Sequence, residues 1–362
     1  MRHCRYVGRL SISIPAQRER HPIPWPPLWK FCSYPTTQSA PSQSDSIDVF
    51  GRSLCFQHCG LRGRRQHRRR TPSPRRFLHR HVCQRQHRPG ITAPGLFDGF
   101  NIDWEFPTAT DTQNFTALLR EFRSQLNTLS KATGKQYTLS FDGPAGSQNY
   151  VNIDLRKAAA QVDFITIDGY NYSGSWVTQT NDASPLFDSR KDPLFGQGLD
   201  IDDTVNAYLK ACVPPHKYTM GLPLYGAGWT GVPNANHGLY QSSTAPSPVL
   251  LANGTALCPD LSGNTPGCDT LLTPGLLTYS TLSTLTSNGY SNYFDPRRIA
   301  VSLYDPASGT FYTYDDPATA FLKMMYIELK VPGGLGGSYV WALKDDDANG
   351  TMVKTMAAGL GR

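Results

Sequence analysis

The chain has 362 residues, of which 39% are hydrophobic and 17% are charged, so it can form one large domain or two of ordinary size. No stretch approaches the roughly 20 apolar residues of a membrane-spanning helix, so we expect no membrane protein. The net charge of +7 is unevenly distributed, because residues 1–93 contain 18 Lys and Arg against three acidic residues. Residues 94–362 contain 17 against 25, so the chain consists of two unlike parts.

Residues 1–93 form an arginine-rich segment whose apolar residues follow neither a strand nor a helix period. Three interpretations stay open: a nucleic-acid-binding arm, a disordered segment, or translation of the wrong reading frame or of a retained intron. We expect no nucleic-acid partner, because no reader module or interleaved aromatic residues accompany the arginines. No signal peptide is visible. Cys55, His58 and Cys59 fit no zinc-finger spacing, so no metal site is expected.

From residue 94 onward, short apolar runs alternate with helical patterns, which is typical of parallel strands joined by crossover helices. The predicted strands are 97–106, 137–141, 164–170, 218–225 and 338–343. Thr110 and Gln113 are predicted to form a capping box for the helix after the first strand, and Gly134 to end that helix. Asp316 and Pro317 are predicted to begin a later helix.

Residues 230–315 interrupt this alternation with a stretch rich in Thr, Ser, Gly, Asn and Pro. Its clearest element is a predicted hairpin of residues 299–304 and 310–314, so we expect an inserted subdomain here. The flanking ranges 94–229 and 316–362 together form the α/β part. They are shorter than the roughly 250 residues of an eight-unit barrel, and five strand–helix units fit.

The chemically most informative run is FDGFNIDWEFP at residues 97–107. On a strand, Asn101, Asp103 and Glu105 point to one face. Two acids so placed in a low-dielectric interior raise one another's pKa, which leaves one protonated near neutral pH. A proton donor beside an ionised partner is what glycoside cleavage requires.

With this run, the sequence resembles the chitinases of glycoside hydrolase family 18, whose signature DxxDxDxE is matched by Asp98, Asn101, Asp103 and Glu105. The resemblance continues with YNYSGSW at 170–176, GLPLYGAGW at 221–229, YDDP at 314–317 and GGSYVWALKDDD at 336–347. It implies an α/β fold, a (β/α)8 TIM barrel with an α+β chitinase insertion between strands 7 and 8. Only strands 4 to 8 are recognisable, so the barrel is expected to be incomplete.

The resemblance also implies a retaining, substrate-assisted hydrolysis of β-1,4-linked N-acetylglucosamine polymers by a secreted monomer without cofactor or metal. Glu105 is the implied proton donor, Asp103 is implied to hold the substrate acetamido group and Tyr170 to bind its oxygen, and Asp98 is implied to be structural. The implied substrate-binding residues are Asn101, Asn171, Trp176, Tyr225 and Trp341.

Three positions depart from the family pattern: Asn101 and Asn171 replace Asp, and Asp168 replaces a common Met. The amides can still form hydrogen bonds, so a shifted pH optimum is expected rather than loss of chemistry. The alternatives are a lectin-like carbohydrate-binding protein, an inactive product of a damaged gene, and an endo-β-N-acetylglucosaminidase acting on glycoproteins. Retention of Glu105 argues against the lectin, because lectin-like relatives typically lose this acid.

Overall fold

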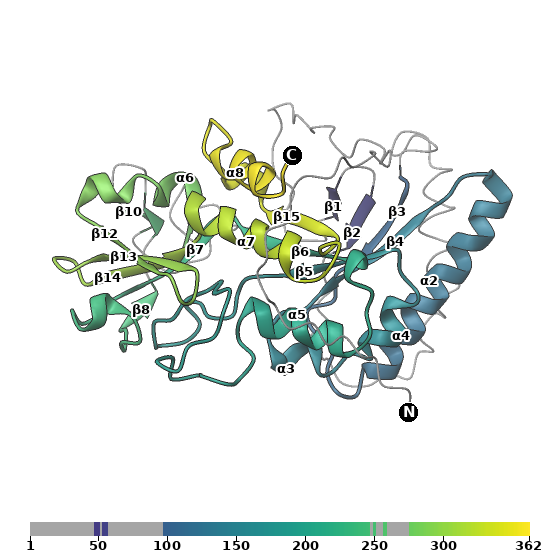
Figure 1. Ribbon diagram of the computed structural model, residues 1–362, viewed down its shortest axis with the longest axis horizontal. Helices are drawn as coiled ribbons and strands as arrows, with labels where there is room; N and C mark the ends of the chain where they lie inside the picture. The colour runs from purple at the N-terminus through teal and green to yellow at the C-terminus, as the bar shows by residue number, and fades with distance from the viewer. Residues whose placement is uncertain (1–46, 51–52, 57–96, 247–248, 251–255, 259–274) are drawn as a thin grey trace.

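The computed structural model describes residues 47–50, 53–56, 97–246, 249–250, 256–258 and 275–362. Its main element is a seven-stranded sheet with the order β1-β2-β3-β4-β5-β6-β15 (Figure 1). Five of these strands are parallel neighbours in chain order: β3 (Gly99–Ile102), β4 (Thr138–Gly143), β5 (Phe164–Asp168), β6 (Tyr218–Pro223) and β15 (Gly337–Trp341). The predicted series of five parallel strands is therefore confirmed.

Two further strands come from the arginine-rich segment. β1 (Ile47–Phe50) and β2 (Ser53–Phe56) pair antiparallel, and β2 lies parallel to β3 in the register Ser53↔Gly99 to Phe56↔Ile102. Neither strand is predicted from the sequence, because four-residue strands carry too short a pattern and depend on pairing with β3. The other predictions for residues 1–93 fall outside the described residues, and the completeness of the barrel stays a prediction.

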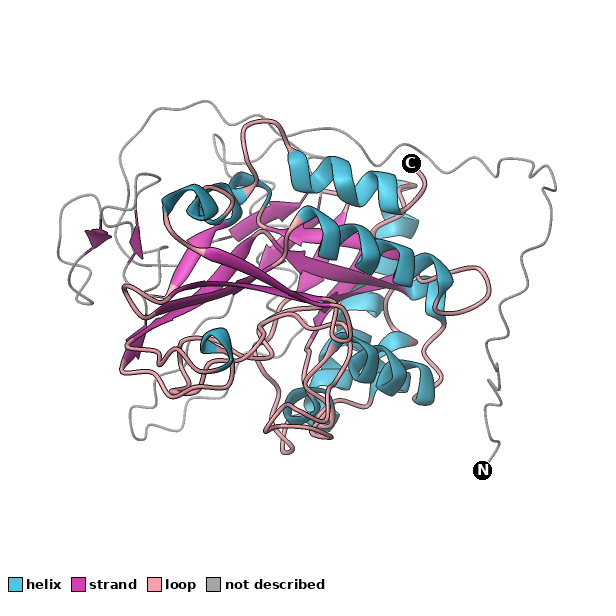
Figure 2. Cartoon of the chain, turned by 60° about the vertical axis from the view of Figure 1, so that its left-hand side comes forward, coloured by secondary structure: helices cyan, strands magenta, loops and turns pink. Residues whose placement is uncertain are grey.

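Helices lie above and below the strands (Figure 2). They are α2 (Thr112–Thr133), α3 (Ser147–Tyr150), α4 (Leu155–Ala159), α5 (Ile201–Lys210), α6 (Tyr279–Leu282), α7 (Pro317–Leu329) and α8 (Thr351–Gly359). The apolar face of α2 packs on the sheet, where the rings of Phe115 and Phe141 lie 5.4 Å apart and those of Phe100 and Phe122 lie 5.5 Å apart. Within the described ranges, no helix is both long and apolar enough to span a bilayer.

The helix ends test three predictions. Gly134 ends α2 with φ +71°, and Asp316 caps α7 by accepting a hydrogen bond from the Thr319 backbone N–H at 2.8 Å, so both predictions are confirmed. The predicted capping box of Thr110 and Gln113 is wrong. The helix begins one residue after Asp111, whose carboxylate instead accepts hydrogen bonds from the backbone and hydroxyl of Thr108 in the preceding turn.

A second, antiparallel sheet lies between β6 and β15 in the sequence, with the order β11-β7-β14-β13-β12. Its strands are β7 (Tyr225–Thr230), β11 (Leu276–Thr278), β12 (Ser291–Asp295), β13 (Ala300–Asp305) and β14 (Thr310–Tyr314). β13 and β14 form the predicted hairpin, and the short β8 (Ala245–Pro246) pairs with β7, while β9 (Val249–Leu250) pairs with β10 (Ala256–Cys258). β7 begins at Tyr225, before the predicted start of the insertion at residue 230. The predicted domain boundaries themselves stay a prediction.

Buried ion pairs tie the loop after β5 to the rest of the chain. Arg298 is 1% exposed and lies 2.9 Å from Asp192 and 3.2 Å from Asp182, both in that loop. On α7, the fully buried Lys323 lies 2.5 Å from Asp315 and also donates hydrogen bonds to Ser184 in the same loop. These contacts hold the loop against α7 and the antiparallel sheet.

We predict that Lys323→Ala lowers the free energy of unfolding by about 3–5 kcal/mol, because it leaves the buried Asp315 without its counter-charge. The control is Lys157→Ala, which removes an exposed ion pair with Asp154 and is expected to cost at most about 1 kcal/mol. Urea unfolding of both variants measures the difference. Equal losses in the two variants would contradict the structural role given to Lys323.

Candidate active site

The carboxyl ends of the parallel strands lie along the same side of the sheet, and the predicted acids Asp103 and Glu105 lie there. β3 ends at Ile102, so the prediction of a strand through Phe106 is wrong, and Asp103 and Glu105 lie in the loop that follows. Carboxyl oxygens of Asp103 and Glu105 nevertheless lie within 4.8 Å of each other, as expected for side chains on one side of the segment. Trp104 turns the other way and packs its ring 5.9 Å from that of Phe115.

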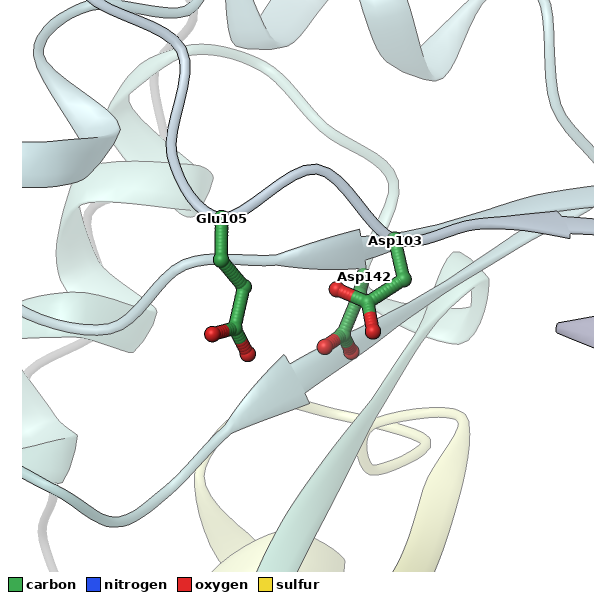
Figure 3. Close-up of side chains that lie close together, drawn as sticks. All are labelled: Asp103, Glu105 and Asp142. Carbon is green, nitrogen blue, oxygen red and sulfur yellow. The ribbon is translucent and has the colours of Figure 1, made fainter. Parts of the chain in front are cut away.

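Three carboxyl groups form the centre of the site. Carboxyl oxygens of Asp103, Glu105 and Asp142 all lie within 4.8 Å of one another. The carboxyl groups of Asp103 and Asp142 are side by side, and Glu105 extends in the same direction from the loop (Figure 3). The structure therefore brings together the two predicted acids and adds a third from β4.

Hydrogen bonds between register-paired residues of neighbouring strands hold Asn101 and Asp142 in place. Asn101 pairs with Ser140 across β3 and β4, and the Ser140 hydroxyl donates a 2.6 Å hydrogen bond to the Asn101 amide oxygen. Asp142 pairs with Thr166 across β4 and β5, and the Thr166 hydroxyl donates a 2.8 Å hydrogen bond to Asp142 Oδ1. Burial, and then the nearby carboxyl of Asp168, raise the pKa of Asp142 well above its ordinary value.

Asp168, the last residue of β5, extends the acidic wall of the site. Tyr339 on β15 reaches across β6 and donates a 2.6 Å hydrogen bond to Asp168 Oδ1. Gly221 on β6 makes this possible, since a Cβ there would lie 2.5 Å from the Tyr339 ring. Burial raises the pKa of Asp168 to about 6, although hydrogen bonds from Tyr339 and Tyr170 oppose the shift. Asp168, which replaces a common Met of the family pattern, thus adds a buried carboxyl group to the site.

Tyr170, Asn171 and Tyr225 form a second group in contact. The rings of Tyr170 and Tyr225 meet edge to face at 6.1 Å, and the Tyr225 hydroxyl donates a 2.8 Å hydrogen bond to the side-chain oxygen of Asn171. Asn171 has φ +60°, a conformation that Asn tolerates better than most residues. Burial raises the pKa of Tyr170 well above its ordinary value, so its hydroxyl stays a donor at neutral pH.

The remaining predicted residues lie further out. Trp341 is the last residue of β15, pairs with Pro223 of β6 and is partly buried. Trp176, in the loop after β5, is 62% exposed. Asp98 precedes β3 at its opposite end, where its carboxylate lies 2.5 Å from the Lys135 ammonium. The roles given to these residues stay predictions.

Sequence reasoning missed Asp142 and Tyr339. Asp142 comes directly after the predicted strand 137–141, and Asp168 falls near the end of the next. The carboxyl ends of neighbouring parallel strands lie on the same side of a sheet. An acid at the end of each of these two strands was therefore the signal that could have brought Asp142 and Asp168 together in the prediction. Tyr339 left no comparable signal, since its contact with Asp168 depends on a glycine in the strand between them.

Two acidic groups among the described residues have the spacing of metal ligands: the one around Asp103 and another of Asp188, Asp200 and Asp203. In the second group, Asp200 caps α5 by accepting a hydrogen bond from the Asp203 backbone N–H at 2.9 Å. Spacing alone does not identify a metal site, and we assign no metal to either group. The expectation of a metal-free site stays a prediction.

Comparison with known proteins connects this site to one family. The sequence model of "Glycosyl hydrolases family 18" matches residues 77–346 and so begins within the arginine-rich segment. Chitinase A1 of Niallia circulans is 31% identical over 282 residues, which are 73% of this chain and 37% of that protein. Chitinase B of Serratia marcescens is 29% identical over 72% of this chain and 57% of its own length. The chain thus spans well under two thirds of these relatives.

Solved structures of chitinases also align with this chain. Chitinase ChiW from Paenibacillus sp. str. FPU-7 aligns with a TM-score of 0.64 and 29% identity, over 81% of this chain and 31% of that chain. A class V chitinase from Nicotiana tobaccum in complex with NAG4 aligns with a TM-score of 0.59 and 25% identity, over 74% of this chain and 69% of that chain.

We predict that Tyr339→Phe raises the pKa of Asp168 above about 6, because the lost hydrogen bond stabilises the ionised carboxylate. A hydrogen bond to a charged group of about 1.5–3 kcal/mol corresponds to a rise of about one to two units. Titration of the carboxyl carbon by NMR measures the shift. Tyr225→Phe is the control, because the Tyr225 hydroxyl donates to Asn171 instead. An unchanged Asp168 titration in Tyr339→Phe would refute the contact.

Proposed function

Because the chain belongs to the glycosyl hydrolases of family 18, we propose that it hydrolyses β-1,4-linked polymers of N-acetylglucosamine such as chitin. The observation that carries this proposal is the grouping of the Asp103 and Glu105 carboxyl oxygens within 4.8 Å at the end of β3. The relatives described as chitinases, and the plant chitinase solved with NAG4, support the choice of substrate class.

In the proposed reaction, the Glu105 carboxyl donates its proton to the glycosidic oxygen as the bond to the anomeric carbon breaks. The acetamido oxygen of the same sugar attacks that carbon and forms an oxazolinium ion. Asp103 accepts a hydrogen bond from the acetamido N–H, and its negative charge balances the positive charge that develops there. No protein carboxylate acts as nucleophile, so the scheme differs from the usual pair of catalytic carboxylates.

In the second half of the reaction, the Glu105 carboxylate takes a proton from a water molecule that attacks the anomeric carbon. This attack opens the oxazolinium ring, regenerates the acetamido group and retains the configuration of the sugar. Glu105 is then protonated again for the next cycle, so one residue serves as acid and then as base.

Aromatic residues around Asp103 and Glu105 supply the remaining contacts with the proposed sugar substrate. When substrate binds, the Tyr170 hydroxyl turns from Asp168 and donates a hydrogen bond to the acetamido oxygen, for which the raised pKa of this buried phenol is suitable. Trp341 forms an apolar floor under the sugar, and Tyr225 and the exposed Trp176 add surfaces on which sugar rings pack. Since the proposed substrate is an insoluble extracellular polymer, we also propose that the protein acts outside the cell.

We predict that Glu105→Gln lowers kcat for a fluorogenic chitobioside or chitotrioside by about 10²–10⁴-fold, because the amide cannot donate the proton. Binding of chitooligosaccharides, followed by titration calorimetry, is expected to persist. Glu328→Gln makes the same chemical change on an exposed residue at the end of α7 and serves as the control. Wild-type protein that binds these sugars without cleaving them would instead establish the lectin-like alternative.

We predict that Asn101→Asp shifts the alkaline limb of the kcat/KM profile to higher pH. The new negative charge at residue 101, four residues before Glu105, favours the protonated form of Glu105, so the proton donor stays active further into the alkaline range. A shift of about half to one unit is expected for a partly screened neighbouring charge. Asn152→Asp, on a loop facing α2, is the control for a general change of charge. A profile identical to that of the wild type would refute this role of residue 101.

A further inference from the structure

The neighbour of Asp103 across the sheet is a carboxyl group. Asn101, which precedes Asp103 by two residues, has its amide oxygen engaged by the Ser140 hydroxyl of β4. Two residues further along β4, Asp142 places its carboxyl oxygens within 4.8 Å of those of Asp103 and Glu105. Figure 3 shows the Asp103 and Asp142 groups adjacent, with Glu105 to their left. Asp142 is thus the member of β4 that faces both proposed catalytic acids.

The two carboxyl oxygens of Asp142 have different hydrogen-bonding roles. Oδ1 accepts a hydrogen bond from the Thr166 hydroxyl at 2.8 Å. A proton on the carboxyl group is therefore best placed on Oδ2, from which the neutral acid can donate to a neighbouring carboxylate. Hydrogen bonds from a neutral acid to a carboxylate are among the strongest available to side chains.

The charged surroundings of Asp142 favour this proton. The ionisable groups that face it come from the loop after β3, from β5 and its following residues, from α5 and from β15: Asp103, Glu105, Asp168, Tyr170, Tyr208 and Tyr339. All of these are acids or phenols. Burial and the neighbouring carboxyl groups raise the pKa of Asp142 well above its ordinary value, in agreement with a protonated side chain.

We propose that Asp142 is a positioning residue that shares one proton with Asp103, so that Asp103 is held ionised and oriented toward the substrate acetamido group. The inference rests on the proposed function for its catalytic consequence. The proton remains between the two carboxyl groups throughout, so Asp142 contributes no atom to the reaction. The pair carries one negative charge in total, and Glu105 can keep its own proton beside it.

Two substitutions separate this role from packing. Asp142→Asn keeps a neutral side chain that donates to Asp103 and accepts from Thr166, so kcat is expected to stay close to that of the wild type. Asp142→Ala loses the donor, and kcat is expected to fall by about 10- to 100-fold, with a smaller change in KM, as for a misplaced catalytic group. A loss in Asp142→Asn as large as that in Asp142→Ala would overturn the proposal.

The sign of a pH shift gives a second test in the same variants. A hydrogen bond to Asp103 stabilises its ionised form, so in Asp142→Ala the acid limb of kcat/KM is expected to move to higher pH, by about one unit. In Asp142→Asn the shift is expected to be smaller and in the same direction. If Asp142 were ionised, its removal would relieve repulsion and move the acid limb to lower pH, which would overturn the proposal.

Thermal stability tests the shared proton without any reference to activity. A carboxyl that is protonated in the folded state but ionises near pH 4 when unfolded costs stability increasingly as the pH rises from about 4 to its folded pKa. Asp142→Asn lacks this cost, so the Tm of the variant minus that of the wild type is expected to increase from pH 4 to pH 8. A constant difference would overturn the proposal even in an active enzyme, whereas an increasing difference in an inactive chain would refute only the proposed function.

Discussion

The parallel register of β3, β4 and β5 is the constraint on which the chemistry of this protein depends. Adjacent strands lie about 4.8 Å apart, so residues at their carboxyl ends meet even when they are far apart in the sequence. Asp103, Asp142 and Asp168 come from three different strand ends and form one acidic wall. In a buried setting such a wall cannot ionise fully, because each added negative charge raises the cost of the next. The fold thereby retains protons where the proposed hydrolysis needs them.

The distribution of charge in the site differs from that expected from the family pattern. Asn101 and Asn171 carry amides where the resemblance led us to expect carboxyl groups, and both amide oxygens accept hydrogen bonds from neighbouring hydroxyls. Carboxyl groups instead occupy positions 142 and 168 on the next two strands. The site therefore keeps an acidic inner side, in which carboxyl groups on β4 and β5 lie beside those of Asp103 and Glu105.

The surrounding framework fixes the parts of the site that are not on the parallel strands. Tyr225 belongs to β7, so the antiparallel sheet contributes a residue directly to the group around Tyr170. Ser184 links Lys323 on α7 to the backbone oxygen of Gly169, to which its hydroxyl donates a 2.5 Å hydrogen bond. A buried cation thus supports the turn between Asp168 and Tyr170. Stability and geometry of the site are coupled through this contact.

Local patterns in the sequence determined the five parallel strands, the hairpin of β13 and β14, the stop at Gly134 and the start at Asp316. Each of these depends on alternation, helical spacing or a capping residue within a few positions, and such local patterns can be read directly from the sequence. The motif around Asp103 and Glu105 was recognisable for the same reason.

Only the tertiary structure decided which side chains from separate strands meet. Asp142 joins Asp103 through the register of β4 against β3, 39 residues away along the chain. Tyr339 reaches Asp168 only because Gly221 leaves space in the strand between them. The end of β3 and the addition of β2 to its edge likewise depend on pairing. Register, close approach and burial are properties of several segments packed together, so no local stretch of sequence encodes them.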